Sequence, residues 1–446
     1  MDGVVTERQK QELFAKEGQF LERVNAAGHE LFQRGAYAVA ARLFERCYRL
    51  RPRMGAYAVN YGSALWHLGE YEEAERILTQ QVIDWPSYDD GRENYGKVLS
   101  TLGRFDEAEA QFNEILRRAP DNHRVKMQRA FTRLDRGDWE GGLEDYEARL
   151  LVRDYQKFPP EMPVWNGEDL TGKTLYVQAE QGAGDTFLFS RYLAWVKATW
   201  PTCRIKFCAH HRLITALWYY VSQGLVEYLP EGVPWAEARA DYGIYLASLP
   251  RLHKTRPATV PLDPGLIEQR CSPGIFKLPN PELGHPLKIG ICWTGNPEMK
   301  ENSRRSVPVT EFLKLSGDPR YLLYSFQVGN EARQQMLDCM AHESICDISP
   351  AISAPHGFVE TGRALMECDV VITVCTVTAH LAGCMGVPTW LLLSKEPYWI
   401  WGREGDTTPW YPSMRLFRQQ EFGKWGDVFA RVTDELAKLY EKTTYA

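Results

Sequence analysis

A single carboxylate stands at the start of an amphipathic helical pattern in the stretch AEQGAGDTFLFSRYLAW, residues 179–195. The stretch leaves a strand-like apolar segment, and Gly182 and Gly184 allow a sharp backbone turn before Asp185. An aspartate at this place is commonly a helix cap, which stabilises the helix by about 1 kcal/mol. It is also a candidate general base that takes a proton from an attacking hydroxyl. The candidate substrate-binding residues of this turn are Gln181, Gly182 and Gly184.

A cluster of cations follows a polar turn in the second candidate stretch, GICWTGNPEMKENSRRSVP, residues 290–308. The predicted strand ends at Trp293, so the turn lies at a strand's carboxyl end. Cations at this place favour neutralisation of phosphate, and a solvated basic loop is the simpler alternative. The candidate binding residues are Thr294, Gly295, Asn296, Lys300, Arg304 and Arg305.

Hydroxyl groups begin the helical pattern of the third candidate stretch, CDVVITVCTVTAHLAGCMGVPTWLLL, residues 368–393. Free amides and hydroxyls at a helix N-terminus cradle a diphosphate without a Walker lysine. A histidine inside the helix is a possible phosphate donor, although a helical histidine is more often a hydrogen-bonded core residue. The candidate binding residues are Cys375, Thr376, Val377, Thr378 and His380.

The elements that must position these residues alternate between strand and helix. A first set has predicted strands at 174–180, 204–209, 225–229 and 242–247, with helices near 186–199 and 211–223. A second set has predicted strands at 287–293, 321–328, 369–374, 389–394 and 414–419, with helices near 309–316, 329–342, 357–367 and 377–386. Such alternation predicts two parallel, doubly wound sheets with a cleft between them. Ligands of these folds bind at the carboxyl ends of strands, where the three stretches are expected to meet.

The N-terminal third repeats itself every 34 residues. Glycines recur at Gly35, Gly69, Gly103 and Gly137, each followed two residues later by an aromatic residue and five residues later by Ala or Gly. Prolines close three of the four units. Each unit reads as two antiparallel helices joined by a glycine turn, and the pattern resembles the tetratricopeptide repeat. Such repeats stack into a solenoid whose groove commonly receives a peptide or protein partner, the alternative being a purely structural stalk.

Composition limits the classes of function. The 446 residues carry a net charge of −6, which argues against nucleic-acid and membrane-surface binding. No window reaches the roughly 18 apolar residues of a membrane span, and the start of the chain lacks the apolar core of a signal peptide. Ten scattered cysteines suit buried thiols in a cytoplasmic protein. The stretch CRIKFCAHH lies on a predicted strand without a second ligand pair, so no metal site is expected.

Four motifs together resemble bacterial tetratricopeptide-repeat proteins with a glycosyltransferase-like C-terminal region. They are GxGD after a strand, WTGNP…K…RRS, VITV-C-T-x-x-AHLAG-x-x-GVPTW, and PWYPSMRLFRQ. The region is similar to the heptosyltransferase type of the GT-B fold and, more distantly, to O-linked N-acetylglucosamine transferases. The resemblance runs from about residue 20 to the C-terminus and distinguishes neither donor nor acceptor.

The resemblance implies an inverting transfer of a sugar from a nucleotide-activated donor to a hydroxyl acceptor, without a metal ion or other cofactor. Asp185 would be the general base, Thr376, Thr378 and His380 would hold the donor diphosphate, and the three cations would stabilise the leaving group. One position departs from the pattern: such sequences usually show DTxxAHL, and here Cys375 replaces the aspartate. A thiol does not accept sugar hydroxyls as a carboxylate does. The donor therefore differs from that of the family, or activity has been lost.

The expected domain order follows from these patterns. It comprises a tetratricopeptide solenoid at 1–152, a linker at 153–172, an acceptor-side GT-B domain at 173–270, a nucleotide-sugar domain at 287–424, and a closing helix at 425–446 that is a candidate to cross back onto the first sheet. An aromatic-rich segment at 395–412 either shapes the donor pocket or simply packs. The function expected is that of a cytoplasmic glycosyltransferase acting on a protein held by the repeats. The alternative is an inactive repeat scaffold with a degenerate nucleotide-binding domain.

Overall fold

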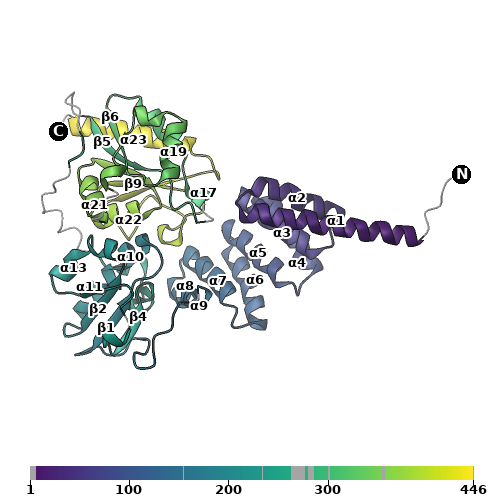
Figure 1. Cartoon of the computed structure of the whole chain (residues 1–446), viewed down its shortest axis with the longest axis horizontal. Helices are drawn as coiled ribbons and strands as arrows, with labels where there is room; N and C mark the ends of the chain where they lie inside the picture. The colour runs from purple at the N-terminus through teal and green to yellow at the C-terminus, as the bar shows by residue number, and fades with distance from the viewer. Residues whose placement is uncertain are drawn as a thin grey trace. The chain divides into compact units, whose positions relative to one another are not determined.

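The chain forms two compact units, Met1–Asp154 and Tyr155–Ala446, in a computed structural model (Figure 1). The structure describes residues 7–153, 155–233, 235–262, 277–279, 286–299, 302–352 and 357–444. The first unit is helical throughout its described residues, and the second alternates strands and helices.

The first unit consists of paired antiparallel helices. They are α1 (Glu7–Gln33), α2 (Tyr37–Leu50), α3 (Gly55–Leu68), α4 (Tyr71–Asp84), α5 (Asp89–Thr101), α6 (Phe105–Arg118), α7 (His123–Arg136), α8 (Trp139–Tyr146) and the short α9 (Arg149–Val152). The four glycines of the repeat stand in the turns within the pairs, with φ between 78° and 92°. A Cβ atom at Gly103 would meet nothing within 4 Å, so the left-handed backbone alone requires glycine there.

Small residues let the paired helices approach closely. Ala40, Ala74 and Ala108 are fully buried on the second helices of their pairs. On the first helices, a Cβ atom at Gly96 would lie 2.6 Å from the Phe112 ring. The predicted repeat geometry is thereby confirmed at its turns and at its closest contacts.

The second unit contains a four-stranded and a six-stranded sheet, both parallel. The first has the order β3-β2-β1-β4, from β1 (Thr174–Gln178), β2 (Arg204–Ala209), β3 (Glu227–Pro230) and β4 (Tyr242–Tyr245). Its helical segments are α10 (Ala183–Phe189), α11 (Arg191–Thr199), α12 (His211–Ile214), α13 (Trp218–Ser222), α14 (Trp235–Ala238), η1 (Leu246–Ser248), α15 (Leu249–His253) and η2 (Pro257–Thr259). The helix expected over 211–223 is thus divided between α12 and α13.

The second sheet has the order β10-β9-β8-β5-β6-β7. Its strands are β5 (Leu287–Cys292), β6 (Tyr321–Ser325), β7 (Cys346–Asp347), β8 (Val370–Val374), β9 (Thr389–Leu393) and β10 (Met414–Arg418). Its helical segments are α17 (Asn302–Arg305), α18 (Val309–Ser316), α19 (Asn330–Asp338), η4 (Ala341–Glu343), α20 (Ser349–Ile352), α21 (Phe358–Met366), α22 (Val377–Cys384), η5 (Trp399–Trp401) and α23 (Gly426–Thr444). The two-residue β7 is an element that the sequence patterns did not predict.

The strand order reverses beside β1 in the first sheet and beside β5 in the second, which is the doubly wound topology. The predicted fold class is confirmed: helical tetratricopeptide repeats precede two parallel α/β sheets, consistent with a GT-B-like arrangement. The closing helix differs from expectation. Trp425, Val428 and Val432 of this C-terminal segment join the core of the second sheet, and Phe429 packs edge-on against Phe312 of α18. The apolar face of α23 therefore covers the second sheet instead of crossing to the first.

Candidate functional site

Three loops carry the candidate residues, and each follows a strand at a point where the strand order reverses. The first loop follows β1, the second follows β5, and the third follows β8, the neighbour of β5. Helices α10 and α22, which begin at the first and third loops, pack against each other between the two sheets (Figure 1). The topology thus directs loops distant in sequence to one region of the α/β unit.

Asp185 occupies the third position of α10 and folds back to cap the helix. Its Oδ2 atom accepts a hydrogen bond from the main-chain N–H of Gly182 at 3.1 Å. This is the carboxylate half of a capping box, so Asp185 caps from within the helix and not from the position before it. Its side chain is only half-buried.

The turn before α10 holds an unusual backbone conformation. Gln181 has a φ of 69°, a region that residues other than glycine rarely adopt, and its N–H donates to the Tyr155 hydroxyl at 3.4 Å. Glu180, which precedes it, is buried, and both its carboxylate oxygens accept from the N–H of Ala247 at 3.2 and 3.3 Å. Such outliers concentrate at functional sites, because surrounding contacts must hold them. Glu180 was not singled out from the sequence, where nothing signals its burial.

A cavity of about 250 Å³ opens at this turn, at the carboxyl ends of β1, β2 and β3. Its lining residues are Ala179, Glu180, Gln181, Gly182, Ala183, Thr186, His210, Arg212, Leu213, Glu231 and Phe358. Phe358 comes from α21 of the second sheet and packs edge-on against Phe187. The candidate residues Gln181 and Gly182 therefore face a cavity to which both sheets contribute, whereas Asp185 is not among its lining residues.

The turn after β5 is held by two amide side chains. The Oε1 atom of Gln327 accepts from the N–H groups of Trp293 and Thr294 at 3.1 and 3.0 Å. The Oδ1 atom of Asn302 accepts from the N–H of Gly295 at 2.9 Å, and its Nδ2 donates to the Thr294 hydroxyl at 2.9 Å. The amides of Thr294 and Gly295 thus already have acceptors.

The candidate cations of this loop differ in their partners. Arg304 forms a largely buried ion pair with Glu396 and lies over the Phe422 ring. Within the described residues, Arg305 has no carboxylate in ion-pair contact: its guanidinium contacts Asn302 and the Met299 sulfur. Lys300 lies outside the described residues. Asn296 accepts from the N–H of Glu298 at 3.0 Å and so stabilises the turn.

The start of α22 has no side-chain cap among the described residues. Thr376 occupies the N-cap position, and its side chain makes no capping bond, since its hydroxyl lies 3.4 Å from that of Thr373. Val377 and Thr378 form the first turn, and the first backbone bond of the helix there is from His380 N–H to Thr376 C=O at 3.3 Å. Within the described part of the chain, no side chain caps these N-terminal amides, and the helix dipole favours an anion at this end.

His380 is a buried ring that joins α22 to its surroundings. Its Nδ1 atom lies 2.9 Å from the Tyr411 hydroxyl, and Trp401 stacks on the ring at 5.4 Å. A Cβ atom at Gly184 of α10 would lie 2.8 Å from the ring, so glycine permits this helix contact. Burial, with Arg191 and Arg305 nearby, lowers the pKa of His380 to about 3. The imidazole is therefore neutral near pH 7.

Cys375 directly precedes Thr376, the N-cap residue of α22. Its sulfur accepts a hydrogen bond from the indole Nε1–H of Trp401 at 3.2 Å. Burial raises the pKa of this thiol, the Trp401 contact and Arg305 lower it, and Asp185 raises it. The charges of Asp185 and Arg305, which lie on different loops, thus both act on the Cys375 thiol.

Several supporting residues escaped sequence reasoning, namely Gln327, Asn302, Trp401, Tyr411 and Arg418. Only the aromatic composition of 395–412 signalled any of them. Among the described residues, no three His, Cys, Asp or Glu side chains are grouped so as to hold a metal ion. None of the described helices has the length and apolar character needed to cross a bilayer.

Comparison with known proteins supports the repeat assignment. The family model described as tetratricopeptide repeat matches residues 25–89 and 95–159. The chain is similar to protein FlbA of Caulobacter vibrioides, with 25% identity over 389 aligned positions; the match covers 73% of this chain and 63% of FlbA.

Solved structures with detectable similarity include two bacterial proteins. MamA from Desulfovibrio magneticus, from residue 41 to its end, has 17% identity and a TM-score of 0.27, covering 30% of this chain and 77% of MamA. A tetratricopeptide repeat protein from Parabacteroides merdae has 18% identity and a TM-score of 0.27, covering 31% of this chain and 55% of its own. The chain is thus a tetratricopeptide-repeat protein, distantly related to FlbA, with a C-terminal region of parallel α/β sheets.

Proposed function

We propose that the α/β unit is a glycosyltransferase that moves a sugar from a nucleoside diphosphate donor to a hydroxyl acceptor with inversion. One observation supports the proposal: α10, with Asp185 in its first turn, packs against α22 through Gly184 and His380, and the charges of Asp185 and Arg305 both act on Cys375 just before α22. A carboxylate, a cation and free helix amides are what such a transfer uses.

We assign to Asp185 the role of general base, which takes the proton from the acceptor hydroxyl. Its carboxylate accepts from the Gly182 amide at the start of α10 and is half-buried, at the carboxyl-end side of β1 where an acceptor hydroxyl would have to bind. A positioned base of this kind contributes about 10²- to 10⁴-fold to rate.

We assign binding of the donor diphosphate to Arg305 and to the main-chain amides of Val377 and Thr378. They meet the charge that builds on the leaving group as the glycosidic bond breaks. Arg304 is left out of this role, because its charge is committed to Glu396. His380 is assigned the support of Trp401 and not phosphate binding, since its ring is neutral and buried.

We assign binding of the acceptor protein to the tetratricopeptide repeats. Successive first helices of the repeat pairs are linked by polar side chains: Asn60 donates to Asn25 at 2.9 Å, and Trp66 donates to Thr101 at 2.8 Å. Polar side chains along such helices suit the main chain of an extended segment. The proposed acceptor is therefore a hydroxyl on a protein bound by the tetratricopeptide unit.

Binding of nucleoside diphosphates is the first test. Thermal unfolding is followed with UDP, GDP, CDP, ADP and dTDP, and a ligand at about 100 times its Kd adds about 2.7 kcal/mol of stability. Arg305→Met should abolish the shift, whereas Arg333→Met, on the exposed face of α19, should keep it. If none of the five nucleotides raises the Tm, the donor site is refuted.

Turnover is the second test. Hydrolysis of the matching sugar nucleotide should fall by about 10²-fold or more in Asp185→Asn, in EDTA as well as in Mg²⁺. Equal turnover in wild type and variant would remove Asp185 from the mechanism.

A non-catalytic scaffold that binds a nucleotide is the second candidate. It is favoured by Cys375, where a carboxylate is expected, and by the internal pairing of Arg304. Nucleotide binding without any turnover by wild type would select this reading.

A further inference from the structure

The loop between β9 and β10 is fastened by one guanidinium. Arg418, the last residue of β10, donates from Nε to the carbonyl of Gly405 at 2.7 Å and from Nη1 to that of Gly402 at 2.8 Å. Its Nη2 donates to the carbonyls of Trp401 at 2.6 Å and Glu404 at 3.0 Å. Four main-chain carbonyls of residues 401–405 thus converge on one side chain.

The hydrogen bonds of the Arg418 guanidinium all go to carbonyls of this loop. Within the described part of the chain, no carboxylate forms an ion pair with its guanidinium, and burial lowers the pKa of Arg418 to about 10. Gly402 and Gly405, with φ of 62° and 76°, let the chain turn its carbonyls toward the arginine. Five N–H donors in a planar fork match several carbonyls at once, which the point charge of a lysine does not.

The loop carries Trp401 to the candidate site. The carbonyl of Trp401 is one of the four acceptors, so Arg418 holds this residue directly. The indole of Trp401 donates to Cys375 at 3.2 Å and stacks on His380, which lies on α22. The contacts therefore run from Arg418 to Trp401 and on to the residues that flank the N-terminal amides of α22.

We infer that Arg418 is a positioning residue that holds the Trp401 indole over Cys375 and so forms one wall of the nucleotide-sugar site. The identity of the ligand rests on the proposed function, whereas the positioning is a property of the protein alone. Without the guanidinium, the carbonyls of residues 401–405 turn to water, the indole leaves the sulfur, and Cys375 becomes accessible.

Reactivity of Cys375 reports this directly. Full-length wild type, Arg418→Met, Arg418→Lys and Trp401→Phe are treated with iodoacetamide, and alkylation of each cysteine is followed by mass spectrometry. Cys375 should react about tenfold faster or more in all three variants, because exposure governs attack on a buried thiol. Cys339 and Cys346, the other half-buried thiols described, are internal controls and should keep their rates.

Arg415→Met is the matched control, since Arg415 lies on the same strand and pairs with the side chains of Glu435 and Asp406, but donates to none of the carbonyls of residues 401–405. It should leave Cys375 unchanged. An unchanged rate at Cys375 in Arg418→Met, or an equal rise at all three thiols, would overturn the inference. If Arg418→Met does not fold, the milder Arg418→Lys and Trp401→Phe decide in the same way.

Nucleotide binding separates this inference from the proposed function. A nucleoside diphosphate that stabilises wild type should bind Arg418→Lys about tenfold more weakly, with Arg415→Met unaffected. If Cys375 responds as expected while wild type binds no nucleotide, Arg418 remains a positioning residue and the donor assignment fails. If nucleotide binds equally to wild type and Arg418→Lys, the wall that Arg418 supports does not belong to the nucleotide site.

Discussion

At the scale of single residues, Asp185 has both a helix-capping contact and a proposed role as general base. The same carboxylate that closes the first turn of α10 also raises the pKa of the Cys375 thiol through its charge. Asp185 can therefore cap the helix and also act as a base. A substitution that removes the negative charge but keeps a hydrogen-bond acceptor for Gly182 separates the two roles.

Asp185→Asn should keep the cap and lose the base. Its amide oxygen still accepts from Gly182, so the free energy of unfolding should change by less than about 0.5 kcal/mol, whereas Asp185→Ala should lose about 1 kcal/mol. Urea unfolding of both variants measures this. Equal losses in the two variants would mean that the contact with Gly182 contributes nothing to stability.

His380 should make the protein sensitive to acid. Its folded-state pKa of about 3 lies below the ordinary value of 6.5, so between these values the unfolded chain takes up a proton that the folded chain refuses. The free energy of unfolding therefore falls as the pH drops below about 6.5, by at most about 1.4 kcal/mol per pH unit.

The comparison that isolates this effect is urea unfolding of wild type and His380→Gln between about pH 7 and pH 5. The variant should lose less stability than wild type over this interval. Tyr411→Phe, which removes the hydroxyl beside the ring but keeps the imidazole, should retain the wild-type slope. A slope in His380→Gln as steep as that of wild type would contradict the prediction.

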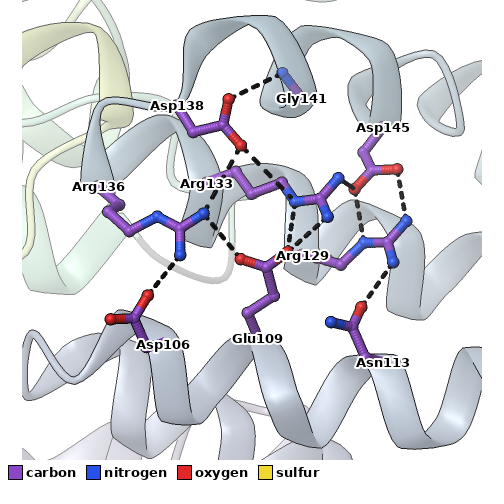
Figure 2. Close-up of polar contacts among 9 residues, drawn as sticks. All are labelled: Asp106, Glu109, Asn113, Arg129, Arg133, Arg136, Asp138, Gly141 and Asp145. Carbon is purple, nitrogen blue, oxygen red and sulfur yellow. Dashed lines mark hydrogen bonds and ion pairs between the residues drawn. The ribbon is translucent and has the colours of Figure 1, made fainter.

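At the scale of helices and strands, an ionic cluster joins α6, α7 and α8 (Figure 2). Arg129, Arg133 and Arg136 of α7 meet carboxylates from both neighbours. Arg129 contacts the two oxygens of Asp145 at 2.7 and 2.8 Å, and Arg133 donates to the same carboxylate at 3.0 Å. The carboxylate of Asp145 is only 10% exposed, whereas that of Asp106, which pairs with Arg136, is 90% exposed.

Asp145→Asn should therefore loosen the last repeat. Removing a largely buried charge leaves two arginines underpaired, at a cost of about 3 kcal/mol, while Asp106→Asn should cost less than about 1 kcal/mol. Hydrogen exchange of the full chain should show faster exchange of α7 and α8 amides in Asp145→Asn alone. Equal exchange in the two variants would show that burial does not set the strength of these pairs.

The sequence predicted the positions of strands and helices better than it predicted which side chains contact each other. Apolar runs located every long strand because a buried parallel strand needs a continuous apolar stretch, but β7, with Cys346 and Asp347, is too short to leave a pattern. The closing helix was predicted from the sequence, whereas the sheet that it covers was not. Arg304 stood among the candidate phosphate ligands because its partner Glu396 lies 92 residues away. Spacing reveals faces and turns; it does not reveal which distant side chain satisfies a charge.

At the scale of the whole molecule, the two α/β sheets of the second unit are joined by a buried arginine. Arg191 of α11 donates to the carbonyl of Trp410 at 2.7 Å, and its guanidinium lies over the Tyr411 ring at 4.8 Å. Nearby, the Cys384 thiol of α22 lies 3.5 Å from the carbonyl of Phe187. These contacts tie the start of the first sheet's helices to the loop before β10.

Arg191→Met should weaken the joint between the sheets. Hydrogen bonds from a charged donor contribute about 1.5–3 kcal/mol each, so the Tm should fall by several degrees and the calorimetric transition should broaden or split. Arg204→Met, at the exposed start of β2, is the control and should leave the transition unchanged. An unaltered single transition in Arg191→Met would mean that apolar packing alone joins the sheets.

The ionic cluster also constrains how this chain could have lengthened. The residues 34 and 68 positions before Arg129 are Tyr95 and Tyr61, and those before Arg133 are Leu99 and Leu65. Only the last junction has exchanged this apolar series for arginines, whose carboxylate partners lie partly on α6 of the preceding unit.

We therefore expect the chain to tolerate an added repeat more readily before the third helix pair than after the fourth. Duplicating residues 55–88 should yield a longer, folded protein, because each new junction repeats the apolar one. Duplicating residues 123–156 should not, because α7 of the extra copy would face α8 without the matching acids of α6. Thermal unfolding of the two products tests this expectation. A similar Tm for both would mean that all junctions between repeats are equivalent. The charged junction between α6 and α7 thus predicts that repeats can be added upstream of Phe105 but not after α8.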